Sequence, residues 1–257
     1  MSIVLEEVIK APASISMSGL SKSFNKSHYV LENINLSIKR GEFFILLGPS
    51  GCGKSTLLNM IAGFIEKTSG DLRVDRKEVT KPGRNRGVVF QQADAALFPW
   101  LTVKENVAFG LKMKKIPKDI RDETSTRFIE LVGLKGHEHK FPRELSGGMK
   151  QRVQLARVLA NDPDILLMDE PFGALDAMTR RTMQTELVRI WKETNKTVIF
   201  VTHDIQEALL LGQRVGVMSV GPSSRIDHIY DLRMPYPRSF TDKEFNLYYQ
   251  SIQAHFD

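Results

Sequence analysis

Two short segments of this chain have the residue types and spacing of phosphate-binding loops. Residues 48–55 read GPSGCGKS and fit the pattern G-x-x-x-x-G-K-[ST], in which backbone N–H groups, a lysine and a hydroxyl surround the phosphates of a nucleotide. Residues 145–152 read LSGGMKQR and lead into the helix-like run VQLARVLA, so backbone N–H groups and a positive helix end would face outward. Since one nucleotide needs one such loop, the second segment indicates that another copy of the fold contributes to each site.

The chemistry of the first segment predicts a role for several of its residues. Its glycines let the backbone approach phosphate closely, and Lys54 is predicted to reach the β- and γ-phosphates as a compact positive charge. Ser55 is predicted to offer its hydroxyl to Mg²⁺. A glycine-rich turn before any helix is the alternative, but this segment follows an apolar strand and opens a helix, as a phosphate loop must. The predicted nucleotide-binding residues here are Gly48, Pro49, Ser50, Gly51, Cys52, Gly53, Lys54, Ser55 and Thr56.

Three polar residues at the ends of apolar runs are candidates for the catalytic chemistry. Asp169 ends the run ILLMD and Glu170 follows it; a carboxylate at that edge of a sheet can hold Mg²⁺, and the next one can polarise the attacking water. His203 ends a later apolar run, where it is predicted to lie beside Glu170, contact the γ-phosphate and orient the water. The predicted catalytic residues are therefore Lys54, Glu170 and His203. Two solvated acids and a structural histidine are the alternative interpretation.

The elements that must position these side chains have the pattern of an α/β fold. Short apolar segments alternate with helix-like ones, which favours a mostly parallel sheet. The predicted strands are residues 43–47, 87–91, 164–170, 197–204 and 214–220. A helix is predicted over residues 54–63, where Gly63 can end it.

The chain is predicted to divide into one large domain and a short appendage. Residues 1–220 hold the nucleotide-binding motifs, and the pattern from about residue 92 to residue 162 is mainly helical, which indicates an inserted helical subdomain. Residues 221–257 are rich in proline and charge and are predicted to form a short C-terminal appendage.

Composition excludes several classes of protein. The chain has 257 residues, of which 42% are hydrophobic and 26% charged, as in an ordinary globular protein. It contains no apolar stretch of the roughly 18–20 residues that span a bilayer, and its first ten residues lack the basic and apolar regions of a secretory signal. The single cysteine, Cys52, rules out an intramolecular disulfide. The net charge of +6 arises from lysines and arginines dispersed among 30 acidic residues, which favours a solvated surface over a nucleic-acid-binding face.

The order of the motifs resembles that of the ATPase subunit of an ATP-binding cassette (ABC) transporter. GPSGCGKST, Gln91 after a strand, LSGGMKQR, ILLMDEP, the ALD of residues 174–176 and His203 follow one another between about residue 15 and residue 220. The resemblance implies a P-loop NTPase core with an antiparallel β part near the N-terminus and the inserted helical subdomain. It also implies that two subunits, identical or related, pack head to tail around two ATP molecules with Mg²⁺.

Further residues acquire roles from this resemblance. Ser146, Gly147 and Gly148 of one subunit would face the γ-phosphate bound by the other, and Asp176 would help to join the two sites. Gln91 would sense Mg²⁺ and the attacking water, since its amide can both accept and donate. The metal-binding residues are thus predicted to be Ser55, Gln91 and Asp169.

The adenine-binding residue is predicted to be an aromatic near the N-terminus. Phe24, in LSKSF, matches the position where an aromatic ring stacks on adenine in the family. Tyrosine is more usual there, so phenylalanine keeps the stacking face and loses a hydroxyl. Tyr29 as the stacking residue, and a core role for Phe24, are the alternatives.

Finer features are most similar to one branch of importers. LLNMIAGF, KPGRNRGVVFQ, LFPWLTVKENV, PFGALDAMTR and VTHDIQEAL resemble the ATPases of bacterial importers of nitrate, sulfonate, taurine and related small anions. The resemblance implies an integral membrane permease as partner, an indirect link to a solute-binding protein, a peripheral location on the cytoplasmic face of the inner membrane, and no nucleic acid. The solute itself would be held by other subunits.

Two alternatives stay open at this point. The first is an ABC ATPase of another system, acting in lipid transport or on nucleic acid or translation; the nucleic-acid class usually carries two cassettes, a long coiled coil or a basic arm. The second alternative concerns the role of residues 97–100, LFPW. The resemblance places these residues in the groove that receives a helix of the permease. These residues are equally consistent with the core of the helical subdomain itself.

Overall fold

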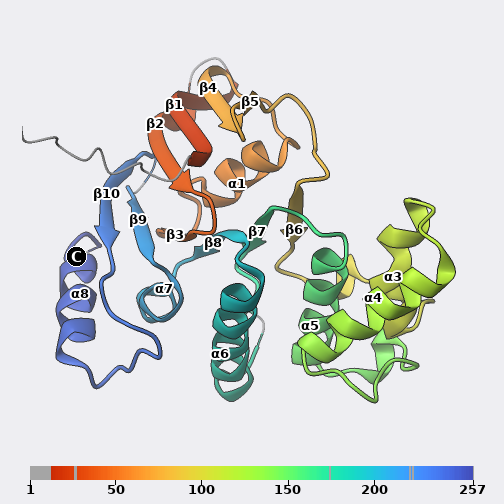
Figure 1. The fold of residues 1–257 in the computed structure, drawn as a ribbon. Coiled ribbons are helices and arrows are strands. Elements are labelled where there is room, and N and C mark those ends of the chain that lie inside the picture. The colour runs from red at the N-terminus through yellow and green to blue at the C-terminus, as the bar shows by residue number, and fades with distance from the viewer. Residues whose placement is uncertain (1–12, 26–27, 174, 220, 222, 257) are drawn as a thin grey trace, which may run out of the picture.

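A six-stranded sheet lies at the centre of the fold (Figure 1). In this computed structural model the chain is described at residues 13–25, 28–173, 175–219, 221 and 223–256. The strands, in order across the sheet, are β10 (Ile226–Asp231), β9 (Arg214–Met218), β3 (Phe43–Leu47), β8 (Thr197–Thr202), β7 (Ile165–Asp169) and β6 (Arg86–Val89). Neighbouring strands run parallel, except for β10, which is antiparallel to β9. The mostly parallel sheet expected from the sequence is therefore confirmed.

Burial on both faces explains why the central strands are continuously apolar. Every residue of β3 and β8 is buried, as in parallel sheets that are covered on both sides. Phe43 and Ile45 enter one core cluster, whereas Phe44 and Leu46 enter the other, because successive side chains of a strand point to opposite faces. The covering helices are α6 (Ala177–Thr194) and α7 (Ile205–Leu211) on the first face and α1 (Lys54–Ala62) on the second (Figure 1).

A second, antiparallel sheet packs over α1. Its strands, in order across the sheet, are β2 (His28–Lys39), β1 (Ala13–Asn25), β4 (Ser69–Val74) and β5 (Lys77–Glu78). The second half of β2 alternates between exposed and buried residues, since this sheet has one face on the core and one on solvent. The antiparallel β part that the family resemblance implied near the N-terminus is thereby confirmed.

A mainly helical part follows β6, as the sequence analysis expected. It contains α2 (Ala93–Ala96), α3 (Val103–Met113), α4 (Lys118–Leu131), the 3₁₀ helix η1 (Pro142–Glu144) and α5 (Gly147–Leu159). Thr102 and Glu105 form a capping box that fixes the start of α3. Figure 1 shows α3, α4 and α5 packed together on the far side of β6 from the antiparallel sheet and α1.

The main sheet continues beyond residue 220, where the sequence analysis places the start of an appendage. β10 pairs with β9 along its length, and α8 (Lys243–Gln253) packs against α7. Four of the six residues of β10 are exposed and none is buried, as is usual at a sheet edge. The segment therefore lacks the apolar run that marks a buried strand, which is why its composition indicated no strand.

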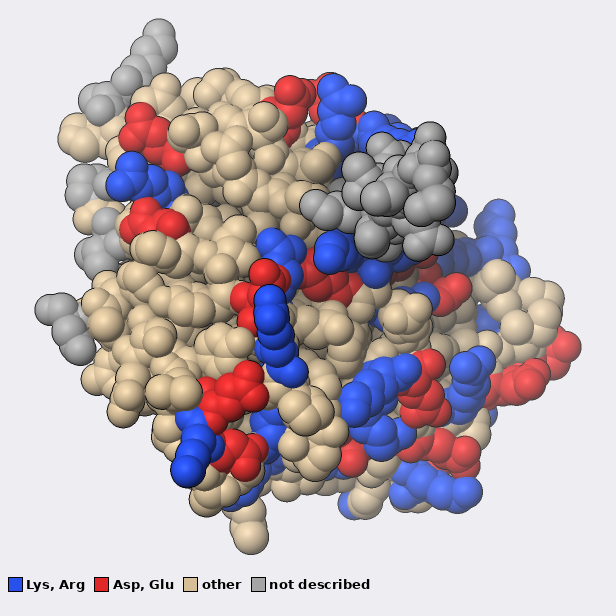
Figure 2. Space-filling view, turned by 60° about the vertical axis from the view of Figure 1, so that its left-hand side comes forward, with Lys and Arg blue, Asp and Glu red and all other residues tan. Residues whose placement is uncertain are grey.

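Charged residues do not gather into one surface of a single sign in the view of Figure 2, where lysines and arginines lie next to aspartates and glutamates. This agrees with the dispersed charge of the sequence. Among the residues that the structure describes, no helix has both the length and the apolar character needed to cross a membrane.

Gly70 is expected to be a strong determinant of stability in the antiparallel sheet. Its φ is +81°, and a Cβ there would lie 2.2 Å from the carbonyl oxygen of Gly19. Gly70→Ala is therefore expected to lower the free energy of unfolding by about 2–4 kcal/mol, measured by urea denaturation. Gly136→Ala is the control, because Gly136 has φ +86° with no atom within 4 Å of a Cβ; its cost is expected to be about 1–2 kcal/mol. If both variants lost the same free energy of unfolding, the close contact between β1 and β4 at Gly70 would not be the cause of the loss.

Candidate active site

The first glycine-rich segment forms the loop between β3 and α1. Gly53 adopts a left-handed conformation, with φ 91°, and is the N-cap of α1. Its carbonyl accepts the first helical hydrogen bond, from Leu57 N at 2.9 Å. Since the first N–H groups of a helix have no partner inside the helix, this turn presents them to an anion. The predicted strand–loop–helix context is present.

Lys54 lies inside this loop and not on the surface. Its side chain is 4% exposed, and its Nζ donates to the carbonyl oxygens of Gly48 at 2.8 Å and Pro49 at 2.7 Å. The same Nζ lies 3.8 Å from Oε1 of Glu170. A buried ammonium held by carbonyl oxygens and facing a carboxylate is well placed to bind the oxygens of a phosphate chain.

Two of the predicted metal-binding residues are in direct contact. Ser55 Oγ donates to Oδ1 of Asp169 at 2.9 Å. Burial raises the pKa of Asp169 above its usual range, although the hydrogen bond from Ser55 opposes this shift. A partly desolvated carboxylate beside a hydroxyl is a set of hard oxygen donors, which fits Mg²⁺. Gln91, the third predicted residue, lines the same cavity as Asp169, with a volume of about 650 Å³.

Glu170 and His203 are brought together by the register of two parallel strands. Asp169 pairs with Val201 across β7 and β8, so the residues that follow each strand meet at the same edge of the sheet. His203 Nδ1 lies 3.1 Å from Oε2 of Glu170. Glu170 has φ +41°, a conformation that strains a residue with a Cβ, and its N–H donates to Val201 O at 3.1 Å. The backbone turn thus holds the carboxylate between Lys54 and His203.

A buried polar network that the sequence analysis did not assign holds the turn after β8. Glu207 accepts from Thr202 Oγ1 at 2.6 Å and from Gln184 Nε2 at 3.0 Å, and burial raises its pKa. Asp204 caps α7 by accepting from Glu207 N at 3.1 Å. The sequence D-x-x-E after a strand is a capping signal that could have revealed the start of α7. The contacts of the Glu207 carboxylate with Gln184 on α6 and with Thr202 beside His203 are tertiary contacts, which this local signal does not predict.

A second unassigned contact links α5 to the end of β6. With its amide oriented to suit both neighbours, Gln154 donates to Phe90 O at 3.1 Å and accepts from Phe90 N at 2.7 Å. Gln91 is the next residue, so α5, the helix that begins with LSGGMKQR, positions the backbone at Gln91. The sequence contains no local signal for this contact, because Gln154 and Phe90 are 64 positions apart (154 − 90).

The residues of the second glycine-rich segment form a separate group. Ser146 caps α5 by accepting from Met149 N at 3.4 Å, and Asp176 caps α6 by accepting from Thr179 N at 3.0 Å. The two caps are neighbours, because a Cβ on Gly148 would lie 2.5 Å from Thr179 Cγ2. Among the described residues, no hydrogen bond or ion pair joins Ser146, Gly147, Gly148 or Asp176 to the loop of residues 48–56. Within one chain, the two predicted phosphate-binding segments are not brought into contact.

The two aromatic candidates for adenine stacking lie on paired strands, one of which contacts the first loop. Phe24 is 64% exposed, and its ring is 4.8 Å from the Nζ of Lys22. It belongs to β1, whose Ser23 pairs with Tyr29 of β2. β2 in turn packs against the loop, because a Cβ on Gly53 would lie 3.1 Å from Val30 Cγ1. The exposure of Phe24 is inconsistent with a core role, and the choice between Phe24 and Tyr29 stays a prediction.

Cys52, in the middle of the loop, is expected to be slow to react with thiol reagents. It is 3% exposed, and burial raises the pKa of its thiol, outweighing the charge of Lys54. Because the thiolate is the reactive form, maleimide labelling at neutral pH is expected to be at least about tenfold slower than that of a free thiol. Labelling of the folded protein and of the protein in urea, followed by mass spectrometry, measures this. Equal rates would mean that the thiol is accessible in the folded loop.

The fold and the geometry of this site define a P-loop ATPase. A buried lysine in a strand–loop–helix turn faces a carboxylate–histidine pair and a serine–aspartate pair at the edge of a parallel sheet. Residues 31–173 match the ABC transporter family. The chain belongs to this family and is an ATP-binding ATPase.

Named relatives and solved structures support this assignment. The chain is 51% identical to the taurine import ATP-binding protein TauB of Roseobacter denitrificans over 226 residues, covering 86% of this chain and 82% of the relative. It is 44% identical to the aliphatic sulfonates import ATP-binding protein SsuB of Bacillus cereus over 247 residues, covering 95% and 96%. The resemblance to the sulfonate and taurine branch that the motifs indicated is thus confirmed.

Two solved structures share the fold. CbiO1 from Clostridium perfringens, part of the ABC transporter complex CbiONQ, superimposes with a TM-score of 0.80 at 31% identity, over 86% of this chain and 89% of that chain. A dimeric ATP-binding cassette in a post-hydrolysis state, bound to ADP and phosphate, superimposes with a TM-score of 0.73 at 33% identity, over 86% of this chain and the whole of the other.

Proposed function

We propose that this chain is the ATP-hydrolysing subunit of an importer for a small organic anion of the taurine or alkanesulfonate class. The observation that carries the ATPase part is the contact of one carboxylate, Glu170, with both Lys54 and His203. The import part is supported by the likeness to relatives that are named for taurine and aliphatic sulfonate import. In this proposal the chain works on the cytoplasmic face of the membrane, together with a permease and, indirectly, a solute-binding protein, and it does not act on nucleic acid.

The proposed chemistry assigns one task to each group of the site. Lys54 neutralises charge on the β- and γ-phosphates, in place of the carbonyl oxygens that its Nζ contacts. Glu170 accepts a proton from the attacking water, and His203, hydrogen-bonded to Glu170, orients that water and contacts the γ-phosphate. Ser55, Asp169 and Gln91 would hold Mg²⁺, which supplies further charge neutralisation on the phosphates.

We propose that each site is completed by a second subunit. Ser146, Gly147 and Gly148 lie apart from the first loop within the chain, and they begin a helix of 13 residues whose N-terminus suits an anion. A head-to-tail partner would bring them to the γ-phosphate, with Asp176 at the contact between the two sites. The dimeric state of a structural neighbour is consistent with this arrangement. The remaining contacts with the nucleotide are proposed to come from the first subunit. The backbone of residues 48–53 would bind phosphate, Thr56 would lie at the α-phosphate, and Phe24 or Tyr29 would stack on adenine.

The permease is proposed to dock beside Gln91 and Trp100. Phe98 is partly buried; its ring contacts that of Phe109, with centroids 4.4 Å apart, and it lines the cavity beside Gln91. Trp100, in contrast, is 70% exposed and lies next to the cavity that Phe98 shares with Gln91. A short helix of a permease in this groove would be moved when the ATPase dimer closes.

Crosslinking tests this docking surface. A Trp100→Cys variant in an assembled membrane complex is expected to crosslink to the permease in high yield, because the new thiol is exposed whereas Cys52 is buried. Met178→Cys, at an exposed position on α6, is the control and is expected not to reach the permease. Equal yields from both positions, or none from Trp100→Cys, would contradict the docking site.

Transport assays test the proposed function as a whole. Reconstituted vesicles that carry the complex with its ATPase side facing the lumen are expected to take up taurine or a short alkanesulfonate only when hydrolysable ATP is enclosed, and ATP turnover is expected to rise with the loaded binding protein outside. Copurification with lipid-transport components or with nucleic acid, without such uptake, would favour the alternative classes. Absence of ATP turnover in the assembled complex would contradict the catalytic part.

A further inference from the structure

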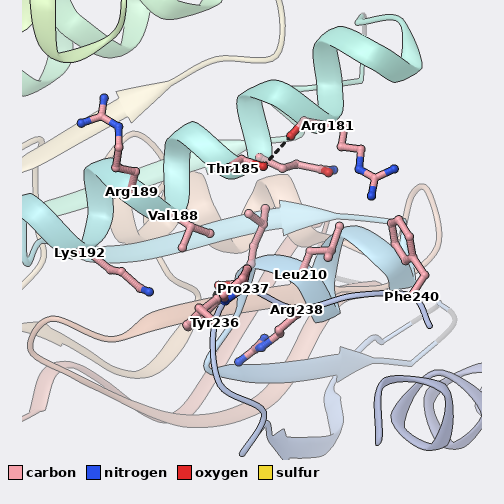
Figure 3. Close-up of a pocket in the computed structure, with 12 residues that line it drawn as sticks. Arg181, Thr185, Val188, Arg189, Lys192, Leu210, Tyr236, Pro237, Arg238 and Phe240 are labelled. Carbon is pink, nitrogen blue, oxygen red and sulfur yellow. Dashed lines mark hydrogen bonds between the residues drawn. The ribbon is translucent and has the colours of Figure 1, made fainter. Parts of the chain in front are cut away.

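A second cavity lies between α6, α7 and the segment that connects β10 to α8. Its volume is about 310 Å³, close to the lower end of the range for small-molecule sites, roughly 300–1,000 Å³. The lining residues are Arg181, Gln184, Thr185, Val188, Arg189, Lys192, Leu210, Leu211, Tyr236, Pro237, Arg238 and Phe240. None of them is a residue of the proposed nucleotide site. We call this the α6–α7 cavity (Figure 3).

The α6 side of this cavity is a stripe of residues with cations at its two ends. Arg181, Thr185, Val188 and Lys192 follow the spacing i, i+4, i+7 and i+11, which places them on one face of the helix. Arg181 and Lys192 are therefore separated by about 16 Å along the axis. Figure 3 shows Val188 and Leu210 between them, so the middle of the cavity is apolar.

The two end cations are held in place but not neutralised. The guanidinium of Arg181 lies 5.4 Å from the ring centroid of Phe240, and the Nζ of Lys192 lies 4.9 Å from that of Tyr236. Among the described residues, neither cation has an ion-pair partner, and no acidic side chain lines the cavity. Cation–π contacts of this kind orient a cation without supplying a negative charge. Arg189 differs, because it is already paired with Glu186 and Glu193.

A third cation, Arg238, is partly buried and donates its hydrogen bonds to carbonyl oxygens, with Glu244 as the acidic side chain that opposes the effect of burial on its pKa. Its Nη1 and Nε donate to carbonyl oxygens, including that of Gly212 at 2.6 Å and that of Met234 at 3.2 Å, and burial lowers its pKa. Charged groups that are removed from water are usually paired with an opposite charge. The excess of positive charge at this apolar cavity therefore comes from Arg181 and Lys192, for which the described residues supply no ion-pair partner.

We propose that the α6–α7 cavity binds an amphiphilic organic anion, with a linear alkyl body along Val188 and Leu210 and its sulfonate or carboxylate group at Arg181 or Lys192. The apolar centre fits the alkyl body, and the unneutralised cations at the ends fit the anionic group. An elongated ligand matches the spacing of the stripe better than a compact one. Because the cavity shares no residue with the proposed nucleotide site, this ligand binds in addition to ATP.

Titration of the full-length protein with octanesulfonate tests the proposal. Binding is followed by calorimetry, below the concentration at which the probe forms micelles, and by the fluorescence of Trp191, which is 8% exposed and 5.9 Å from the Tyr236 ring. A Trp100→Phe background removes the emission of the exposed tryptophan. Methanesulfonate and octanol, which carry only the anionic group or only the alkyl body, are expected to bind at least tenfold more weakly.

Two sets of variants locate the site. Arg181→Gln combined with Lys192→Gln is expected to weaken octanesulfonate binding at least tenfold, whereas Lys118→Gln, an exposed lysine on α4, leaves it unchanged. Thr185→Glu is expected to weaken binding by a similar factor, while Thr185→Gln, of nearly the same shape, has little effect. Thr185 is exposed, so both variants are expected to fold.

Three outcomes would overturn the proposal. If octanol bound as tightly as octanesulfonate, the anionic group would contribute nothing to binding, and the cavity would be an apolar site without anion recognition. Equal affinity of the wild type and the Arg181–Lys192 double variant for octanesulfonate would show that these two cations do not bind the probe. Displacement of octanesulfonate by ATP would place the probe in the nucleotide site, while leaving the proposed ATPase function intact.

Discussion

Replacement of Glu170 by glutamine is expected to lower ATP turnover by about 10²–10⁴-fold, while ATP affinity changes by less than about tenfold. The amide has nearly the same shape as the carboxylate but cannot accept the proton of the attacking water. It leaves Lys54 in its loop, because the Nζ of Lys54 is also held by the carbonyl oxygens of Gly48 and Pro49. Steady-state hydrolysis and equilibrium binding of ATP measure the two effects separately.

The same variant is expected to change the oligomeric state. Under the proposal, product formation separates the two subunits, so Glu170→Gln is expected to accumulate as an ATP-bound dimer in size-exclusion chromatography. Glu78→Gln is the matched control, because Glu78 is an exposed carboxylate paired with Lys67 and far from the site in sequence; it is expected to behave as the wild type. Near-normal turnover of Glu170→Gln would remove this carboxylate from the proposed catalytic role.

Ser146→Arg is expected to abolish turnover and to leave ATP binding to the monomer largely intact. A long side chain at this helix N-terminus would occupy the space through which a partner's γ-phosphate approaches. The monomer's own loop is expected to be unaffected, since among the described residues no hydrogen bond or ion pair joins Ser146 to residues 48–56. Hydrolysis assays at high protein concentration, compared with ATP binding at low concentration, separate the two effects.

Two controls distinguish steric blocking from loss of the helix cap. Ser146→Ala removes the hydrogen bond from Met149 N, worth about 0.5–2 kcal/mol of stability, without adding bulk, and is expected to keep more turnover than Ser146→Arg. In a mixed dimer of Ser146→Arg with a Lys54-deficient chain, both changes fall in one composite site, and the other composite site has neither change. If Ser146→Arg lowered the ATP affinity of the monomer by as large a factor as it lowered turnover, the result would contradict a role for Ser146 in the partner's site.

Local sequence was sufficient to predict the phosphate loop and the main strands. The glycine at position 53 and the lysine that follows it belong to a contiguous pattern, and the turn that this pattern requires is made by the same few residues. Continuously apolar runs predicted β3 and β8, because a strand covered on both faces has no exposed positions. For the same reason, the half-exposed edge strand β10 was missed.

The tertiary structure decided which of the predicted residues meet. The sequence placed Glu170 and His203 at the ends of two strands, and the parallel register of β7 and β8 brought their side chains to 3.1 Å. It also decided contacts for which the chain has no local signal, such as Glu207 with Gln184. The α6–α7 cavity belongs to this second class, because its cations on α6 meet the rings of Tyr236 and Phe240 only when the C-terminal segment folds back. Hydrogen-bonding motifs are encoded over a few neighbouring residues, whereas contacts between distant segments depend on how whole elements pack.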